Sequence, residues 1–300
     1  MMTRADTRWV VPEWGSRWVM ALLLKIAQRV GRRRSAVLLW PISVYCLLAH
    51  RQARRASRAY LRRVLPRAPG TLDVLRHFHA FAQAILDRAF FLLGSGDMPE
   101  IRVKGQEVFL DTLAAGRGCL LLGAHIGSFE AMRAIGHAHG VRMRMLMYRD
   151  NLGGATAALE ALAPGYAEAI LPIGPPETML RVADALAHGE AVGILGDRAA
   201  RTGRTVSASL LGDPVDFPEG PFRLALVTRT PLLLAQALRQ DDGTYEVHFE
   251  ALGLDMPDAG EDRAAFTHAA AVRYAGWMDR TCRAHPFAWF NFYDYWKDLT

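Results

Sequence analysis

A histidine and a glutamate five positions apart are the residues of this sequence whose types and spacing most suggest chemistry. They stand in LLGAHIGSFE, residues 121–130, where His125 ends an apolar run and Glu130 follows a glycine and a serine. A carboxylate hydrogen-bonded to one imidazole nitrogen fixes the tautomer and leaves the other nitrogen as a base. Such a pair is suited to removing a proton from a hydroxyl. The alternative interpretation is a capped strand-to-helix turn with an incidental histidine.

The spacing requires a turn, because five positions on one continuous helix place two side chains about 140° apart. A strand ending near His125, a turn at Gly127 and a new helix would fold the pair together. Ser128 is a good N-cap, and Glu130 then falls in the first helical turn, where the helix dipole favours an ionised carboxylate. We expect Gly127 and Ser128 to line the site.

Other chemistries find little support. The stretch is not HExxH, which argues against a metalloprotease, and Ser128 is not in a GxSxG elbow, which argues against a serine hydrolase. His137 and His139 lie at a predicted helix end and fit an exposed cap better than a metal site. Cys119 lies inside a predicted strand and fits the core better than a nucleophile. We therefore expect no metal.

The bulk composition is that of a folded protein. Of 300 residues, 51% are hydrophobic and 22% charged, with a formal net charge of +6. The three cysteines lie far apart without a CxxC, which suits free thiols in a reducing compartment. The first residues lack the apolar core and cleavage site of a secretory signal, so we expect the protein on the cytoplasmic side.

From residue 99 onwards, apolar strands alternate with helices, the pattern of a mainly parallel, helix-covered sheet. The continuous apolar runs indicate burial on both faces. In such sheets ligands bind outside the carboxyl ends of the strands, which is where His125, and also Asp197 with Arg198, would stand. The strands are predicted near 119–125, 141–148, 169–174 and 191–197.

Residues 1–98 form a basic region with helical periodicity. Arginine-rich segments at 32–34 and 51–63 flank an apolar stretch at 35–49, which is shorter than the roughly 20 residues that a spanning helix needs. These are either ordinary amphipathic helices on a core or, as we favour, helices lying on an anionic membrane surface. No nucleic-acid motif accompanies the arginines, so nucleic acid is not an expected partner.

A further helix is predicted from Thr71 to about Leu93, because phenylalanine and aliphatic residues recur there at helical spacing. The sequence GSGD at 94–97 would end it. His77 and His79 fall within this helix, and we interpret both as structural.

GAHIGSFE, then GILGDR, then FPEGPFRLALVTRTPLL resemble the lysophospholipid acyltransferase superfamily, most closely its bacterial branch of late lipid A biosynthesis acyltransferases. The family's histidine and acidic residue, with four residues between them, are matched by His125 and Glu130. Its Phe-Pro-Glu-Gly turn is matched by residues 217–220, and a later proline by Pro231. The basic N-terminus and the aromatic tail HPFAWFNFYDYWK extend the resemblance over nearly the whole chain.

The sequence departs from the family pattern in two places. Glu130 stands where the glycerolipid branch usually has Asp, and Pro221 and Phe222 replace the usual Thr-Arg after the turn, with Arg223 next. A lipid A-like, glycolipid or other hydroxylated acceptor therefore fits better than a glycerol phosphate.

The resemblance implies an O-acyltransferase that moves a fatty acyl group from a thioester of acyl carrier protein or coenzyme A to a hydroxyl of a lipid or glycolipid. His125 would deprotonate the acceptor, and Glu130 would orient and stabilise the imidazolium. Neither an acyl-enzyme nor a cofactor is needed. Backbone N–H groups near Gly127 and Gly220 are candidates for stabilising the oxyanion.

Further substrate-binding residues are expected at the sheet edge and at the Phe-Pro-Glu-Gly turn. Asp197 and Arg198 should line the site, with Arg198 either binding substrate or forming a structural ion pair. Glu219, beside Gly220, either positions the acceptor or caps the next helix. Arg223 either holds an anionic headgroup or carrier phosphate or is a solvated surface residue.

The expected architecture is an amphipathic membrane-associating region, 1–98, followed by an α/β acyltransferase domain, 99–300, whose aromatic tail either packs on the core or docks at the lipid interface. We expect a peripheral protein on the cytoplasmic face of the bacterial inner membrane. Its expected partners are a lipid acceptor, an anionic membrane surface, and acyl carrier protein or a coenzyme A thioester. Two rivals are a thioesterase, in which water replaces the acceptor, and a non-catalytic module that binds lipid or carrier protein.

Overall fold

A seven-stranded sheet with the order β1-β9-β8-β2-β5-β3-β4 forms the centre of the molecule. The computed structural model describes residues 27–94, 97–148, 166–199, 203–258 and 262–296. Five strands are parallel to one another, namely β2 (Cys119–Gly123), β3 (Met143–Tyr148), β4 (Ile170–Ile173), β5 (Ala191–Leu195) and β8 (Leu232–Arg239). The strand β9 (Tyr245–Ala251) runs antiparallel to β8, and β1 (Ile101–Lys104) runs parallel to β9. The predicted α/β fold with a mainly parallel sheet is confirmed.

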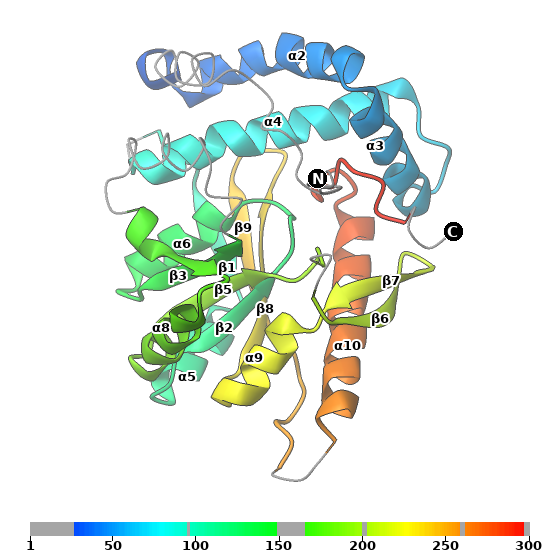
Figure 1. Ribbon diagram of the computed structural model, residues 1–300. Helices are drawn as coiled ribbons and strands as arrows, with labels where there is room; N and C mark the ends of the chain where they lie inside the picture. The colour runs from blue at the N-terminus through cyan, green and yellow to red at the C-terminus, as the bar shows by residue number, and fades with distance from the viewer. Residues whose placement is uncertain (1–26, 95–96, 149–165, 200–202, 259–261, 297–300) are drawn as a thin grey trace, which may run out of the picture.

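Helices cover both faces of this sheet (Figure 1). On one face lie α5 (Gln106–Ala114) and α6 (Phe129–Ala138). The apolar cluster of the other face takes residues from α8 (Pro176–Ala187), α9 (Gly220–Thr228) and α10 (Arg263–Ala284). An antiparallel pair, β6 (Thr205–Leu210) and β7 (Asp213–Pro218), packs against α10.

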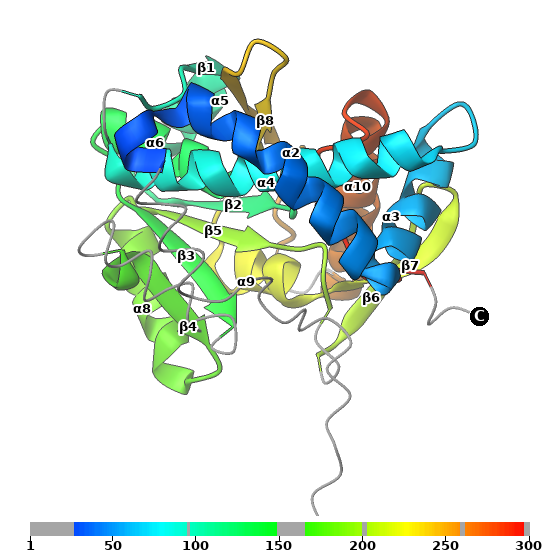
Figure 2. The same ribbon diagram turned by 90° about the horizontal axis from the view of Figure 1, so that it is seen from above.

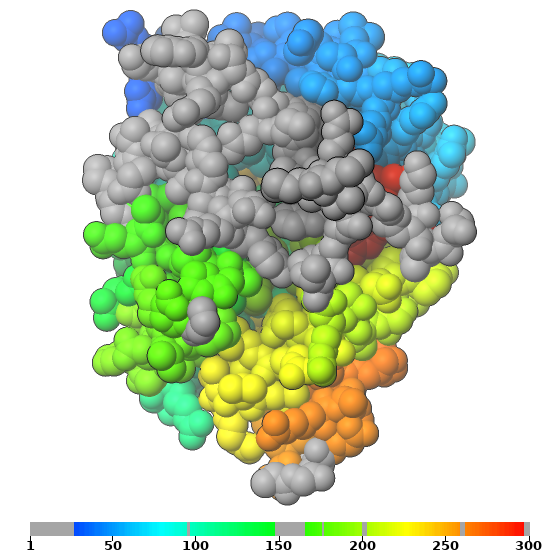
Figure 3. All heavy atoms as spheres, in the orientation of Figure 1, coloured from blue at the N-terminus to red at the C-terminus, as the bar shows by residue number. Residues whose placement is uncertain are grey.

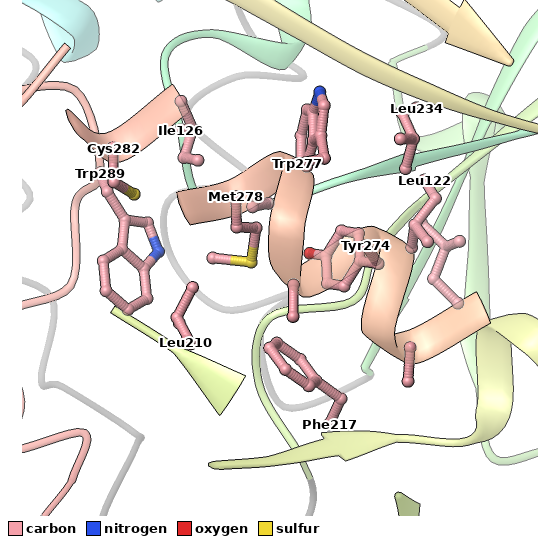
Figure 4. Packing of buried hydrophobic residues seen from close by; sticks show 14 of the residues in the cluster. Leu122, Ile126, Leu210, Phe217, Leu234, Tyr274, Trp277, Met278, Cys282 and Trp289 are labelled. Carbon is pink, nitrogen blue, oxygen red and sulfur yellow. The ribbon is translucent and has the colours of Figure 1, made fainter. Parts of the chain in front are cut away.

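The central strand β2 supplies both cores, because its side chains alternate between the two faces. Leu120 and Leu122 belong to the cluster under α10, where Figure 4 shows Leu122 beside Tyr274. Cys119 and Leu121 belong to the cluster under α5 and α6. Cys119 is fully buried, as predicted, and burial raises its pKa to about 12, so it is a thiol at neutral pH.

Three of the helices described before the first strand lie together at one end of the molecule (Figures 1 and 2). They are α2 (Arg32–Ala49), α3 (Arg51–Val64) and α4 (Thr71–Leu93). The helix α4 has the predicted bounds, because Asp73 accepts the Gly70 N–H at its start and Gly94 takes a left-handed conformation at its end. Residues 1–26 of the predicted amphipathic region lie outside the described residues. Within the described part of the chain, no helix is long and apolar enough to cross a membrane.

Candidate active site

His125 and Asp197 meet at the carboxyl edge of the sheet. His125 lies two residues beyond β2 and Asp197 two residues beyond β5, and these strands are parallel neighbours in register. The imidazole Nδ1 lies 2.8 Å from Oδ1 of Asp197. The Asp197 side chain is fully buried, whereas 29% of the His125 side chain is exposed. A substrate can therefore reach the imidazole, while its carboxylate partner is shielded from solvent.

Asp197 is held from several sides. The indole Nε1 of Trp289 donates to Oδ2 of Asp197 at 3.0 Å, and the Tyr295 hydroxyl donates to its backbone oxygen at 2.7 Å. Burial alone would raise the pKa of Asp197. The His125 imidazole, the Arg198 guanidinium and the indole N–H outweigh that effect and lower the pKa well below its usual range. The carboxylate is therefore ionised and accepts hydrogen bonds only.

This pairing assigns the protons of His125. Because ionised Asp197 only accepts, Nδ1 of His125 carries the proton and Nε2 keeps its lone pair. Burial and the positive charge of Arg198 lower the pKa of His125, and Asp197 acts in the opposite direction without cancelling them. The imidazole is therefore neutral at pH 7, which is the form that a general base requires.

Glu130 does not contact the imidazole in the way the sequence suggested. It lies in the first turn of α6, as predicted, but its carboxylate is 2.6 Å from Nε of Arg88 in α4. The Tyr166 hydroxyl donates to the same carboxylate at 3.3 Å. The helix α6 packs against α4, and the Glu130 carboxylate pairs there with Arg88. Asp197 thus takes the place expected for Glu130, and Glu130 ties α6 to α4.

Gly127 and Ser128 form the turn between β2 and α6. Gly127 has a φ of 67°, and an added Cβ would lie 1.8 Å from the Ala237 oxygen, so this position requires glycine. The Gly127 N–H donates to Ala288 and the Ser128 N–H to Ala237, both at 3.0 Å. The expected oxyanion role for backbone N–H groups at Gly127 is therefore not supported. The Ser128 hydroxyl is buried and has no hydrogen-bond partner among the described residues.

Arg198 lies at the same edge as the histidine pair. Its Nη2 donates to the Phe290 oxygen at 3.1 Å, and its guanidinium lies 5.4 Å from the Tyr293 ring. Its Nε is buried and has no partner within the described ranges. Arg198 therefore lies in the site. It takes part in none of the salt bridges formed among the described residues.

The Phe-Pro-Glu-Gly turn lies at a separate cavity. Phe217 anchors the turn in the core beneath Tyr274, with ring centroids 5.4 Å apart (Figure 4). Glu219 precedes α9, which begins at the exposed Gly220, and its carboxylate makes no cap but lies 3.4 Å from Nη1 of Arg223. Glu219 and Arg223 line a cavity of about 400 Å³ between α9, α10 and β6, and His125 is not among its described lining residues.

Sequence reasoning missed Trp289 and Tyr295 as parts of the site. It placed both in an aromatic tail that either packs or docks at lipid, and the structure confirms packing, with Trp289 and Trp296 buried. The available signal was a run of aromatic side chains that carry hydrogen-bond donors, following a long helix. Such residues usually find a polar partner when buried.

The comparisons with known proteins agree with the sequence motifs. The chain matches the family described as bacterial lipid A biosynthesis acyltransferase over residues 2–298. No curated protein sequence matches it. The family match spans the N-terminal helices, the sheet with its His125–Asp197 pair and the aromatic tail. The chain therefore belongs to the bacterial lipid A biosynthesis acyltransferase family and is an acyltransferase.

Proposed function

We propose that the protein transfers a fatty acyl group from a thioester to a hydroxyl of a lipid A-like or other glycolipid acceptor, with His125 as the general base. The observation that carries this proposal is the 2.8 Å hydrogen bond between Nδ1 of His125 and the buried carboxylate of Asp197. It leaves Nε2 of a neutral, solvent-reachable imidazole free to accept a proton. Asp197 orients the ring and stabilises the imidazolium.

In the proposed reaction, Nε2 takes the acceptor proton as the hydroxyl oxygen attacks the thioester carbonyl. The tetrahedral intermediate then collapses, the carbon–sulfur bond breaks, and the imidazolium returns the proton to the leaving thiolate. The products are an ester and a free thiol, and no enzyme group becomes acylated. Burial keeps the pKa values of Cys119 and Cys282 at about 12, which supports direct transfer because neither is a thiolate at neutral pH.

The developing oxyanion needs donors at this edge. The Ser128 hydroxyl and Nε of Arg198 are buried without a hydrogen-bond partner in the described part of the chain, so both are free to donate. We assign the oxyanion to these two groups in place of the backbone N–H of Gly127. Arg198 also adds a positive charge close to the imidazole.

The donor is acyl carrier protein or a coenzyme A thioester, and both carry phosphate. The cavity between α9 and α10 is lined by Arg204, Arg223 and Arg263, with Glu219 as the carboxylate among its described lining residues. This excess of guanidinium groups suits a phosphate or an acidic protein surface. Competition between the two thioesters in one assay identifies the preferred donor.

We further propose that α2 lies on an anionic membrane surface, the cytoplasmic face of the inner membrane. Exposed arginines stand at both ends of the apolar stretch, Arg33 and Arg34 before it and Arg51 and Arg55 after it. Figure 3 shows α2 along one rim of the molecule. Its large apolar side chains that are 40% to 71% exposed are Val37, Leu38, Trp40, Val44, Tyr45 and Leu48.

Sedimentation with phosphatidylcholine vesicles, with and without phosphatidylglycerol, tests this surface. We expect binding that requires the anionic lipid, weakens with salt and falls in the double variant Val37→Asp/Leu48→Asp. The control is Val272→Asp, because Val272 is 47% exposed on α10, away from α2. Binding that is equal to neutral and anionic vesicles, or unchanged in the double variant, would contradict the proposal.

The transferase activity is tested with wild type and His125→Ala, labelled acyl-carrier protein or acyl-coenzyme A, and a bacterial lipid extract, with products resolved by mass. We expect a new acylated lipid with wild type that His125→Ala does not make. Free fatty acid at a rate independent of acceptor would instead indicate the thioesterase. No turnover of either donor by either protein would favour the binding module.

A further inference from the structure

We propose that Trp289 is a positioning residue for the catalytic base, and that a buried hydrogen-bond chain running from α3 and α4 through Trp289 holds Asp197 against His125. The proposal rests on the proposed role of His125 as the general base. It gives the C-terminal aromatic segment and the histidine of α4 a part in catalysis that neither was expected to have.

The chain has four consecutive links. Ser57 Oγ in α3 lies 2.8 Å from Nδ1 of His77 in α4, and Nε2 of His77 lies 2.9 Å from the Trp289 backbone oxygen. The indole Nε1 of Trp289 donates to Oδ2 of Asp197 at 3.0 Å. Oδ1 of Asp197 then meets Nδ1 of His125 at 2.8 Å. Ser57, His77, Trp289 and Asp197 are all fully buried.

The direction of each hydrogen bond follows from chemistry. A carbonyl oxygen only accepts, so Nε2 of His77 carries the proton, and its Nδ1 accepts from the Ser57 hydroxyl. Burial lowers the pKa of His77 to about 4, so the ring stays neutral at physiological pH. One arrangement of protons therefore satisfies the chain from Ser57 to Trp289.

The indole ring has little freedom to turn. Tyr60, Tyr295 and Trp296 pack against it edge to face, with ring centroids 5.0 to 5.9 Å away. Figure 4 shows Trp289 among the buried side chains next to α10. These neighbours fix the indole ring, and the hydrogen bond from His77 fixes the Trp289 backbone. The indole N–H is therefore directed at Oδ2 of Asp197.

The indole N–H fixes the orientation of the Asp197 carboxylate. The two oxygens of a carboxylate are equivalent and interchange when the group rotates. Holding Oδ2 with the indole leaves Oδ1 for the imidazole and fixes the angle at which Asp197 meets Nδ1. Without the N–H, a buried carboxylate oxygen loses its donor, the group reorients, and the Nδ1–H tautomer of His125 loses its advantage.

The test compares Trp289→Phe with Trp296→Phe. Both variants keep a buried aromatic ring and remove one indole N–H. The Trp296 Nε1 has no hydrogen-bond partner among the described residues, so its loss breaks no bond of the chain. We expect kcat for acyl transfer to fall about 10- to 100-fold in Trp289→Phe, as for loss of one hydrogen bond to a charged group, with KM changed less than about twofold. We expect a smaller loss of kcat in Trp296→Phe than in Trp289→Phe, because phenylalanine keeps a ring against Trp289 and no bond of the chain is broken.

A second readout is independent of turnover. Nitrogen-15 NMR of the histidine side chains distinguishes the two imidazole tautomers, and the spectrum of His125→Gln assigns the His125 signal. We expect the Nδ1–H tautomer in wild type and Trp296→Phe, and a mixture of tautomers in Trp289→Phe. An unchanged tautomer together with unchanged kcat in Trp289→Phe would overturn the proposal.

Two substitutions at His77 test the same hydrogen-bond chain if Trp289→Phe does not fold. His77→Leu removes the donor to the Trp289 oxygen, whereas His77→Gln retains an N–H that can replace it. We expect His77→Leu to show the tautomer mixture and His77→Gln to resemble wild type; identical spectra for the two would overturn the proposal. If wild type itself transfers no acyl group, the proposed function fails, but the tautomer comparison still decides the role of Trp289.

Discussion

Replacing Asp197 and Glu130 separately decides which carboxylate serves the imidazole. Asp197→Asn keeps the shape of the side chain but lets an amide N–H face Nδ1 of His125. The imidazole then changes tautomer, so Nε2 carries the proton and cannot act as a base. We expect kcat to lose the whole rate contribution of a general base. This is about 10²- to 10⁴-fold, or ~3 to 5 kcal/mol in the activation barrier.

Glu130→Gln should behave differently, because Glu130 contacts Arg88 and Tyr166 and not His125. It removes the negative charge opposite a guanidinium that is 28% exposed, so the cost falls on folding. We expect a loss of about 1 to 3 kcal/mol in the free energy of unfolding, between the values for surface and buried ion pairs. The value of kcat should change less than about tenfold.

The assay is kcat at saturating donor and acceptor, paired with urea unfolding of each variant. The reverse order would refute the reasoning: an active Asp197→Asn, and a Glu130→Gln that is inactive but as stable as wild type. In that case Glu130 would be the imidazole partner in the working enzyme, as the sequence motif suggested.

Three further outcomes are expected. Since catalysis needs neutral His125, kcat/KM should fall as the pH drops through a pKa below about 6.5, and a midpoint above 7 would contradict this. Gly127→Ala adds a steric clash to the strain of a positive φ and should cost about 2 to 5 kcal/mol of unfolding free energy, measured in urea. Gly116→Ala, also at positive φ but with no atom within 4 Å of an added Cβ, should cost about 1 to 2 kcal/mol. Because His77 has a folded pKa of about 4, lower than when unfolded, its contribution of about 3 kcal/mol is present above pH 6.5 and is lost as the pH falls towards 4. Unfolding curves of His77→Gln should lack this part of the pH dependence.

Local patterns in the sequence predicted the elements but not how they pair. The helix α4 was predicted with its bounds because its signals are local, namely apolar residues at helical spacing and Gly94 after its last residue. The strand β2 was predicted because a strand buried on both faces is a continuous apolar run. The reversed direction of β9 depends on its pairing with β8 and β1, which periodicity does not specify.

The candidate site shows the same contrast between local features, which were predicted, and contacts between distant residues, which were not. His125 and Asp197 were both predicted to lie at the carboxyl edge, but their contact depends on β2 and β5 being neighbours in the sheet. Glu130 was placed in the correct helical turn, yet the direction of its side chain depends on how α6 packs against α4. Trp289 donates to a residue 92 positions away, and the sequence around it carries no mark of that partner.

The long sequence separations within the buried hydrogen-bond chain have a consequence for folding kinetics. His125 and Asp197 are 72 residues apart, and His77 and Trp289 are 212 residues apart. Contacts between residues so far apart in the sequence form slowly, because the chain between them must close into a loop first. After dilution from denaturant, helical circular dichroism should therefore return before acyl transfer, and the delay measures the docking of the C-terminal segment. Enzyme activity in this protein is a reporter of completed folding.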